Sequence, residues 1–145
     1  MKLSTRSRYG TRLVLDMARH YNQGPIRLSD IARRQNISIK YLEHLIRPLK
    51  QAAYVKSVRG PKGGHYLVTP PEKITIGDIV AVLEGGIQLT VCTADPQTCE
   101  RSDDCATRIV WYEATRAMYE RLSEITVSDL LKLDCEIRKK AENGK

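Results

Sequence analysis

The stretch LSDIARRQNISIKYLEHLIRPLKQAAYV, residues 28–55, contains two amphipathic segments separated by a short polar turn. We expect Ser29 to cap a first helix over residues 30–35, and Ser38 to cap a second helix after the turn at Asn36–Ile37. Two short helices joined by a few residues predict a helix-turn-helix. In the second segment four apolar residues recur on one helical face: Leu42, Leu45, Ile46 and Leu49.

The other face of the second segment is polar and carries Lys40, Glu43, His44, Arg47 and Lys50. In a helix-turn-helix the second helix presents this kind of face to the major groove of DNA. An ordinary helical hairpin is the alternative interpretation of the pattern. Pro48 lacks a backbone donor, so we expect the second helix to kink or end near Arg47.

The next segment, VKSVRGPKGGHYLV, occupies residues 55–68. Residues 55–58 and 65–68 are β-prone, and RGPKGG between them is typical of a hairpin loop. A helix-turn-helix followed by a hairpin predicts a winged helix. Its loop brings Arg59 and Lys62 to phosphates or to a minor groove, where the negative potential favours arginine. A plain surface hairpin with incidental charges is the alternative.

Charge is distributed unevenly along the chain. Residues 1–66 contain 14 of the 24 Lys and Arg residues but 3 of the 17 Asp and Glu residues, which gives a balance of +11. The remaining residues contain 10 basic and 14 acidic side chains, a balance of −4. A basic first half favours a module that binds a polyanion, joined to a second functional region. A solvated basic surface without such a partner is the alternative.

Composition also excludes some classes of protein. The chain has no run of about 18 apolar residues, and its start, MKLSTRSRYG, has no apolar h-region. We therefore expect a cytoplasmic protein with no membrane partner and no secretory signal. No catalytic constellation is visible, and His20, His44 and His65 are scattered, so we expect that the protein is not an enzyme.

The flanking segments extend a mainly α-helical fold with a small β-hairpin wing. We expect Ser4 or Thr5 to cap a helix that runs to about Tyr21, and Thr75 to cap a helix that ends at Gly85–Gly86. The predicted organisation is a winged helix-turn-helix domain over 1–70, a connecting helix and cysteine loop over 71–104, a dimerisation helix with terminal packing over 105–131, and a flexible charged tail over 132–145.

The predicted dimerisation helix spans residues 106–124 and has a wide apolar surface. Such a surface needs a partner, and a second copy of the chain would supply it. A two-fold dimer also matches a palindromic operator. The apolar positions are Val110, Ala114, Met118, Leu122 and Ile125, with Trp111 and Tyr119 beside them.

The segment CTADPQTCERSDDC contains Cys92, Cys99 and Cys105 in the pattern C-x6-C-x5-C. One loop can wrap such thiolates around an inorganic centre, and iron–sulfur clusters are held chiefly by cysteine. A zinc site, a thiol redox switch and incidental thiols remain open, although structural zinc sites usually have paired C-x2–4-C turns. Cys135 is interpreted as a lone tail thiol.

These segments together resemble the IscR/NsrR family of bacterial winged-helix transcription regulators. The resemblance rests on MKLSTRSRYGTRLVLDMA, ISIKYLEHLIRPLK, SVRGPKGGHYLV and the three-cysteine loop, and extends to about Leu131. It implies a homodimer whose dimerisation helices cross. It also implies an iron–sulfur centre that tunes DNA binding from the loop before that helix.

The resemblance carries DNA contacts onto particular residues. The recognition helix would use Ser38, Lys40, Tyr41, Glu43 and His44; the wing would use Arg59, Gly60 and Pro61, beside Lys62; and Arg6 and Arg8 would lie near the backbone. Glu43 can accept a hydrogen bond from the amino group of cytosine. Lys40 and His44 are less typical of IscR-like members, which favours a different operator.

For the cluster, the resemblance implies Cys92, Cys99 and Cys105 as ligands of a 2Fe–2S or 4Fe–4S centre. IscR-like members add a histidine three residues after the last cysteine, where this chain has Arg108. NsrR-like members add an acidic residue from the partner, where this chain has Arg8. The fourth ligand is thus unassigned. The alternatives are a metal-free thiol or zinc-dependent regulator, and an iron–sulfur carrier or electron-transfer protein.

Overall fold

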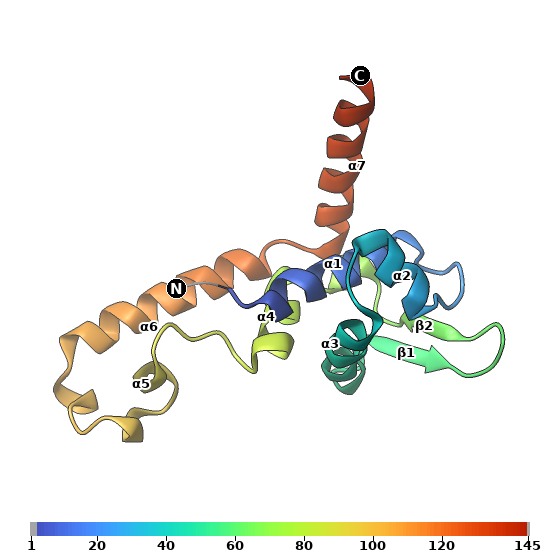
Figure 1. Ribbon diagram of the computed structural model, residues 1–145. Coiled ribbons are helices and arrows are strands. Elements are labelled where there is room, and N and C mark those ends of the chain that lie inside the picture. The colour runs from blue at the N-terminus through green and yellow to red at the C-terminus, as the bar shows by residue number, and fades with distance from the viewer. Residues whose placement is uncertain (1–2, 145) are drawn as a thin grey trace.

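The computed structural model describes residues 3–144 as a mainly helical chain with one antiparallel hairpin, which confirms the predicted fold class (Figure 1). Short 3-10 turns lie at Pro71–Lys73 (η1), Pro96–Thr98 (η2) and Ser102–Asp104 (η3). The strands are β1 (Val55–Val58) and β2 (Gly64–Leu67). The helices are α1 (Thr5–Arg19), α2 (Leu28–Gln35), α3 (Ile39–Gln51), α4 (Ile76–Glu84), α5 (Val91–Ala94), α6 (Ala106–Ser123) and α7 (Val127–Asn143).

Side-chain caps begin most of the longer helices. The hydroxyls of Ser4, Ser38 and Thr75 accept backbone N–H groups at the starts of α1, α3 and α4, as the sequence predicts. The prediction for α2 was wrong: this helix begins at Leu28, with Arg27 at the N-cap and no side-chain cap, so Ser29 lies inside it. Leu28, the first residue of the helix, is buried in the core, and this packing stabilises the start of α2 in place of a capping hydroxyl.

Pro48 was expected to kink or end the second helix near Arg47; the helix does not end there, because α3 continues through Pro48 to Gln51. Proline removes one backbone donor from the helix. However, Leu45 and Leu49 on either side of it are fully buried. Packing of these two leucines stabilises the helical turn around Pro48, which proline by itself would disfavour.

One hydrophobic core joins α1, α2, α3, the hairpin, α4 and the start of α7. This core crosses the boundary expected at residues 70–71, since Ile79 and Leu83 of α4 are buried in the same cluster as Leu13 and Met17 of α1. Gly10 lies against Leu83 so closely that a Cβ atom there would overlap it. The helix α4 is therefore packed in the same body as α1, α2, α3 and the hairpin.

Two helices leave this body in different directions (Figure 1). The helix α6 has no buried residue and leads out to the cysteine segment. The helix α7 starts in the core with Val127, and its backbone N–H donates to Ile74 O over 2.8 Å. Within residues 3–144 no helix is both long enough and apolar enough to cross a membrane.

The residues expected to form a flexible charged tail are helical through Asn143. A capping box between Thr126 and Asp129 begins α7. The guanidinium of Arg19 then donates to both carboxylate oxygens of Asp134, over 3.1 and 2.7 Å. The cap and this ion pair explain why a charged sequence continues as a helix there.

Candidate nucleic-acid interface and thiol loop

The polar face of α3 is exposed along its length. Ser38 caps the helix through the N–H of Tyr41, over 3.2 Å. Lys40, Glu43 and His44 lie on the solvent side, opposite the buried apolar stripe. The structure thus presents these three predicted residues together on one face.

Tyr41 differs from the other predicted contacts because it is half-buried. Its hydroxyl donates to Thr5 Oγ1 over 3.1 Å, and its ring meets that of Tyr9 edge-on, with centroids 5.9 Å apart. Tyr41 therefore joins α3 to α1. The first turn of α1 also carries the exposed Arg6 and Arg8.

The wing consists of β1, β2 and the loop between them, with pairing from Val55–Leu67 to Val58–Gly64. The exposed residues 59–62 form its tip, which contains all four predicted wing contacts: Arg59, Gly60, Pro61 and Lys62. Gly60 has φ of 111°, a conformation that favours glycine.

Several contacts fix the wing to the helices. Ile26 and His65 exchange backbone hydrogen bonds of 2.8 and 2.7 Å, which adds a short bridge beside β2. Lys50 of α3 donates to Ser57 of β1 over 2.9 Å. The recognition helix and the wing are therefore held as one surface.

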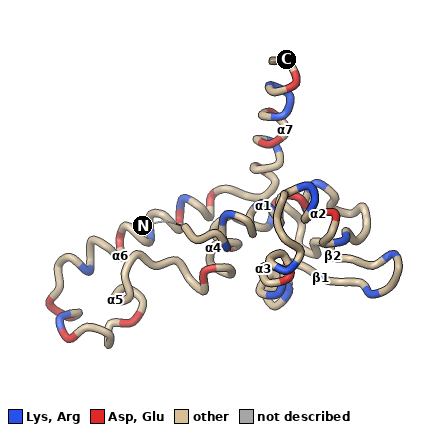
Figure 2. The backbone as a smooth tube through the Cα atoms, viewed as in Figure 1, with Lys and Arg blue, Asp and Glu red and all other residues tan. Residues whose placement is uncertain are grey.

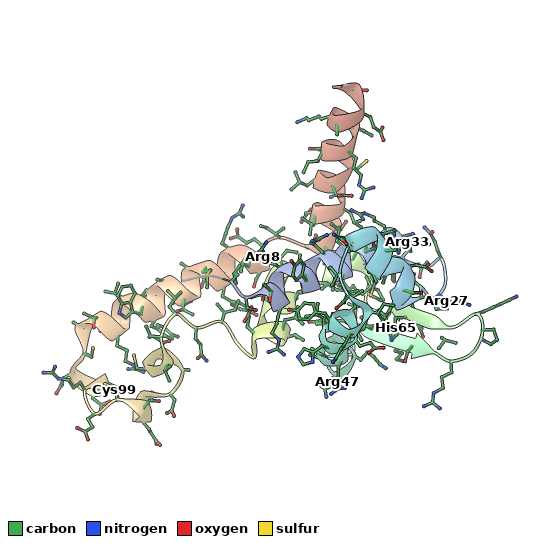
Figure 3. The ribbon with its side chains drawn as sticks, viewed as in Figure 1. Arg8, Arg27, Arg33, Arg47, His65 and Cys99 are labelled. Carbon is green, nitrogen blue, oxygen red and sulfur yellow. The ribbon has the colours of Figure 1, made fainter. Side chains whose placement is uncertain are left out.

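Basic residues gather on α2, α3 and the wing tip, whereas the cysteine segment carries mostly acidic residues (Figure 2). The predicted contact set omitted Arg27, Arg33 and Arg47, which are exposed on this part of the molecule (Figure 3). Spacing already placed Arg47 on the polar face of its helix. Nothing in the local sequence indicated Arg27 or Arg33.

A buried carboxylate positions α2 against α1. Asp16 is fully buried and accepts hydrogen bonds from Arg34, at 2.5 Å, and Gln35, at 2.8 Å. Burial alone would raise the pKa of Asp16, but the hydrogen bonds from Arg34 and Gln35 outweigh it and hold the pKa below its ordinary value. Asp16 is therefore charged in the folded protein.

His65 lies in β2 of the wing, close to Lys50 and Glu43 of α3. Burial lowers the pKa of His65, and the charge of Lys50 lowers it further, against an opposing effect of Glu43. Its Nδ1 atom is buried and has no hydrogen-bond partner among the described residues. A neutral imidazole at this point keeps the packing between wing and helix free of an extra buried charge.

We call residues 92–105 the thiol loop; it lies at the far end of α6 from α7 (Figure 1). Cys99 is exposed (Figure 3), and Cys92 and Cys105 are half-buried. Sγ of Cys92 lies 3.4 Å from Thr90 Oγ1, and Sγ of Cys105 lies 3.1 Å from Thr107 Oγ1. The two half-buried thiols thus have separate hydroxyl partners.

Hydrogen bonds between side chains and the backbone shape this loop. Arg108 donates from Nε to Cys92 O over 2.9 Å and from Nη1 to Ser102 O over 3.4 Å. Ser102 is buried, and its hydroxyl contacts the carbonyl oxygens of Pro96 and Cys99, the latter at 2.6 Å. The loop is closed by the chain's own donors and acceptors.

The thiol loop has the donor chemistry for an iron–sulfur centre but not the arrangement. Within residues 3–144 no three Cys, His, Asp or Glu side chains lie close enough together to hold a metal ion. Arg108, at the histidine position of IscR-like members, is a hydrogen-bond donor and not a ligand. The residues therefore do not fit a cluster as they are placed here.

Comparison with known proteins places this geometry in a family. A family profile described as Rrf2, an iron-dependent transcriptional regulator, matches residues 3–133. Protein rrf2 of Nitratidesulfovibrio vulgaris is 46% identical over 132 residues, covering 91% of this chain and 88% of its own length.

Solved structures agree with this assignment. CymR of Bacillus subtilis, described as the global cysteine regulator, superposes with a TM-score of 0.75 at 38% identity, over 92% of this chain and 98% of its own. The structure described as T. potens IscR gives 0.73 at 39% identity, over 91% and 87% of the two chains. The predicted resemblance to IscR-type regulators is confirmed, and the chain belongs to the Rrf2 family of DNA-binding transcriptional regulators.

Proposed function

We propose that this protein acts as a homodimer that binds a palindromic operator through α3 and the wing. The observation that carries the proposal is the single surface formed by the exposed face of α3 and the wing, in which the Lys50–Ser57 hydrogen bond joins α3 to β1. The helix α3 would enter the major groove, with Lys40, Glu43 and His44 at base edges. Arg59 and Lys62 would reach the neighbouring minor groove or its phosphates.

The exposed surface of α6 supports the homodimer. Ile109, Val110, Trp111 and Tyr112 are all about half exposed or more, from 45% to 64%. An exposed apolar surface of this kind on one helix marks an interaction site. Two copies related by a two-fold axis would each bury it and would place two α3 helices on successive half-sites.

The thiol loop is the proposed signal-receiving element, because it adjoins the first turn of α6 and so the proposed dimer interface. Two kinds of signal suit it. An iron–sulfur cluster on Cys92, Cys99 and Cys105 is favoured by the thiolate donors and by the iron-dependent description of the family. Such a cluster would supply a redox- or iron-sensitive centre at this end of α6.

Thiol chemistry without a metal is favoured by the placement of the side chains. The three thiols do not converge, and Arg108 and Ser102 close the loop without an inorganic centre. Binding of a cluster would therefore require the loop to open and rearrange.

The test of DNA binding is selection of duplexes from a random-sequence pool by the purified protein, followed by titration at several salt concentrations. A palindromic consensus and a steep loss of affinity with salt are expected, because basic side chains displace counterions from phosphate. Binding that does not change with salt would contradict a nucleic-acid interface.

The test of the thiol loop is anaerobic purification with iron and sulfide analysis and visible absorption, beside a variant with all three loop cysteines changed to serine. Stoichiometric iron and sulfide that the variant lacks would establish the cluster. A colourless, iron-free protein whose DNA binding responds to oxidants would establish the thiol mechanism. Visible absorption that persists in the triple-serine variant would contradict the assignment of the thiol loop as the signal-receiving element.

A further inference from the structure

Arg27 connects the helix-turn-helix to the tip of the wing. It is the N-cap residue of α2, and its exposed side chain extends toward the hairpin (Figure 3). Its Nη2 donates a hydrogen bond to the backbone carbonyl of Pro61. Arg27, Pro61 and Lys62 also line one shallow hollow between α2 and the wing.

The wing tip has little else to hold it. Strand pairing stops at Val58–Gly64, and within the tip region the described backbone makes one turn hydrogen bond, from Gly63 N to Gly60 O over 2.9 Å. The contacts made by Ile26 and Lys50 engage the strands and not residues 59–62. In the described part of the chain, the Arg27–Pro61 bond is the hydrogen bond that joins the tip to the helices.

A hairpin with strands this short is mobile by itself, because two isolated strands are at best marginally stable in water. A donor that carries a full charge makes a stronger hydrogen bond to a carbonyl than a neutral donor does. The Arg27 contact therefore limits the positions that the wing tip samples before DNA arrives. Because the wing tip is already restricted in the free protein, it loses less conformational entropy when it binds DNA.

We propose that Arg27 is a positioning residue of the interface: by holding the carbonyl of Pro61, it sets where Arg59 and Lys62 meet the DNA relative to α3. This inference rests on the proposed DNA-binding function. It differs from a direct phosphate contact by Arg27, in which the guanidinium would leave Pro61 and bind the backbone of the duplex.

A double-mutant cycle separates the two roles. The probe is the duplex that the wild-type protein selects from a random pool. Affinity is measured for the wild type, Arg27→Ala, the wing variant Arg59→Ala/Lys62→Ala, and the triple variant. Arg33→Ala, alone and in the wing variant, is the matched control, because it removes one exposed charge from the same helix, α2, without a contact to the wing.

If Arg27 acts through the wing, Arg27→Ala weakens binding by about fivefold in the wild type but less than about twofold in the wing variant, because coupled residues are not additive. Arg33→Ala should change the affinity for DNA by the same factor in the wild type and in the wing variant. Hydroxyl-radical footprints of Arg27→Ala should lose protection at the flanks and keep it over the centre, a change that general destabilisation would not produce.

Equal losses from Arg27→Ala in both backgrounds would overturn the positioning role and assign Arg27 to the phosphates. Unchanged affinity together with an unchanged footprint would also overturn it. Thermal unfolding of each variant checks that the fold is intact, and Arg27→Lys replaces Arg27→Ala in the cycle if the alanine variant is unfolded. If the wild type itself selects no duplex, the proposed function fails, and that result is distinct from additive losses by a protein that binds.

Discussion

The guanidinium of Arg108 and the backbone carbonyl of Cys92 are joined by a hydrogen bond of 2.9 Å, which ties the first turns of α6 to the start of the thiol loop. The same side chain reaches the carbonyl of Ser102 near the end of the loop. One arginine thus spans both ends of the segment that contains the three cysteines. Its position explains how the loop closes without a metal ligand at residue 108.

Arg108→Ala should loosen the thiol loop. Loss of hydrogen bonds from a charged donor typically costs about 1.5–3 kcal/mol, so amides of residues 92–105 should exchange with deuterium roughly tenfold faster or more. Hydrogen exchange with mass spectrometry measures this. Arg116→Ala, which removes an exposed arginine of the same helix paired to Glu113 and Glu120, is the control. Equal exchange in the loop of wild type and Arg108→Ala would show that Arg108 does not close it.

Glu43→Ala and Arg59→Ala should affect DNA binding in different ways. Glu43 lies at the exposed face of α3, so its loss should relax preference at one base pair by about 1–3 kcal/mol. Arg59 lies at the wing tip, and its loss should weaken binding to all sequences and reduce the salt dependence. Titration of single-base variants of the selected duplex measures both. Unchanged affinity and preference in both variants would contradict the groove assignments.

Trp111→Glu should convert the dimer to a monomer. The tryptophan lies on the exposed apolar surface of α6 and is 45% exposed in the single chain. A charge placed in an apolar interface is buried there without a partner. Loss of an aromatic anchor from such an interface commonly costs about 2 kcal/mol or more of binding free energy. Analytical ultracentrifugation measures the mass. Glu113→Ala, two residues along the helix on another face, should remain dimeric, and a monomeric wild type would remove the proposal.

Gly77→Ala should destabilise the protein although alanine is the better helix former. A helical Gly-to-Ala change alone would stabilise by about 1 kcal/mol. Here the new Cβ would lie 3.0 Å from the backbone N of Ser123 and 3.2 Å from its Cα. Overpacking of this kind costs about 1–3 kcal/mol. Chemical denaturation measures the net sign. Ser123→Ala should not destabilise, because the buried hydroxyl has no hydrogen-bond partner among the described residues.

Asp16 should make stability depend on pH in acid. Its pKa in the folded protein lies below the ordinary value of 3.8, so its contribution is present above that pH and is lost as the pH falls through the folded value. Asp16→Asn should lose about 1–3 kcal/mol at pH 7 and show a flatter decline of stability below about pH 4. Urea unfolding at several pH values measures this, with the exposed Asp103→Asn as the control. If the stability of the wild type and of Asp16→Asn declined in parallel as the pH falls, the charged state assigned to Asp16 would be contradicted.

Local sequence was sufficient for the elements of the DNA-binding surface. The spacing of Leu42, Leu45, Ile46 and Leu49 predicted the buried face of α3, and Ser38 predicted its start. The β-prone residues 55–58 matched β1. These features depend on neighbours within a few residues along the chain, where periodicity and capping chemistry act directly.

Tertiary structure decided the features that depend on distant residues. Burial of Leu45 and Leu49 kept α3 helical through Pro48. Arg19, 115 residues from Asp134 in sequence, holds the middle of α7 against α1. The Arg27–Pro61 and Arg108–Cys92 contacts likewise join side chains to backbone carbonyls that no short motif links. The sequence around an arginine is no different when its side chain faces solvent and when it binds a backbone carbonyl. Only the folded chain therefore determines which carbonyl or carboxylate lies within hydrogen-bond distance of the guanidinium.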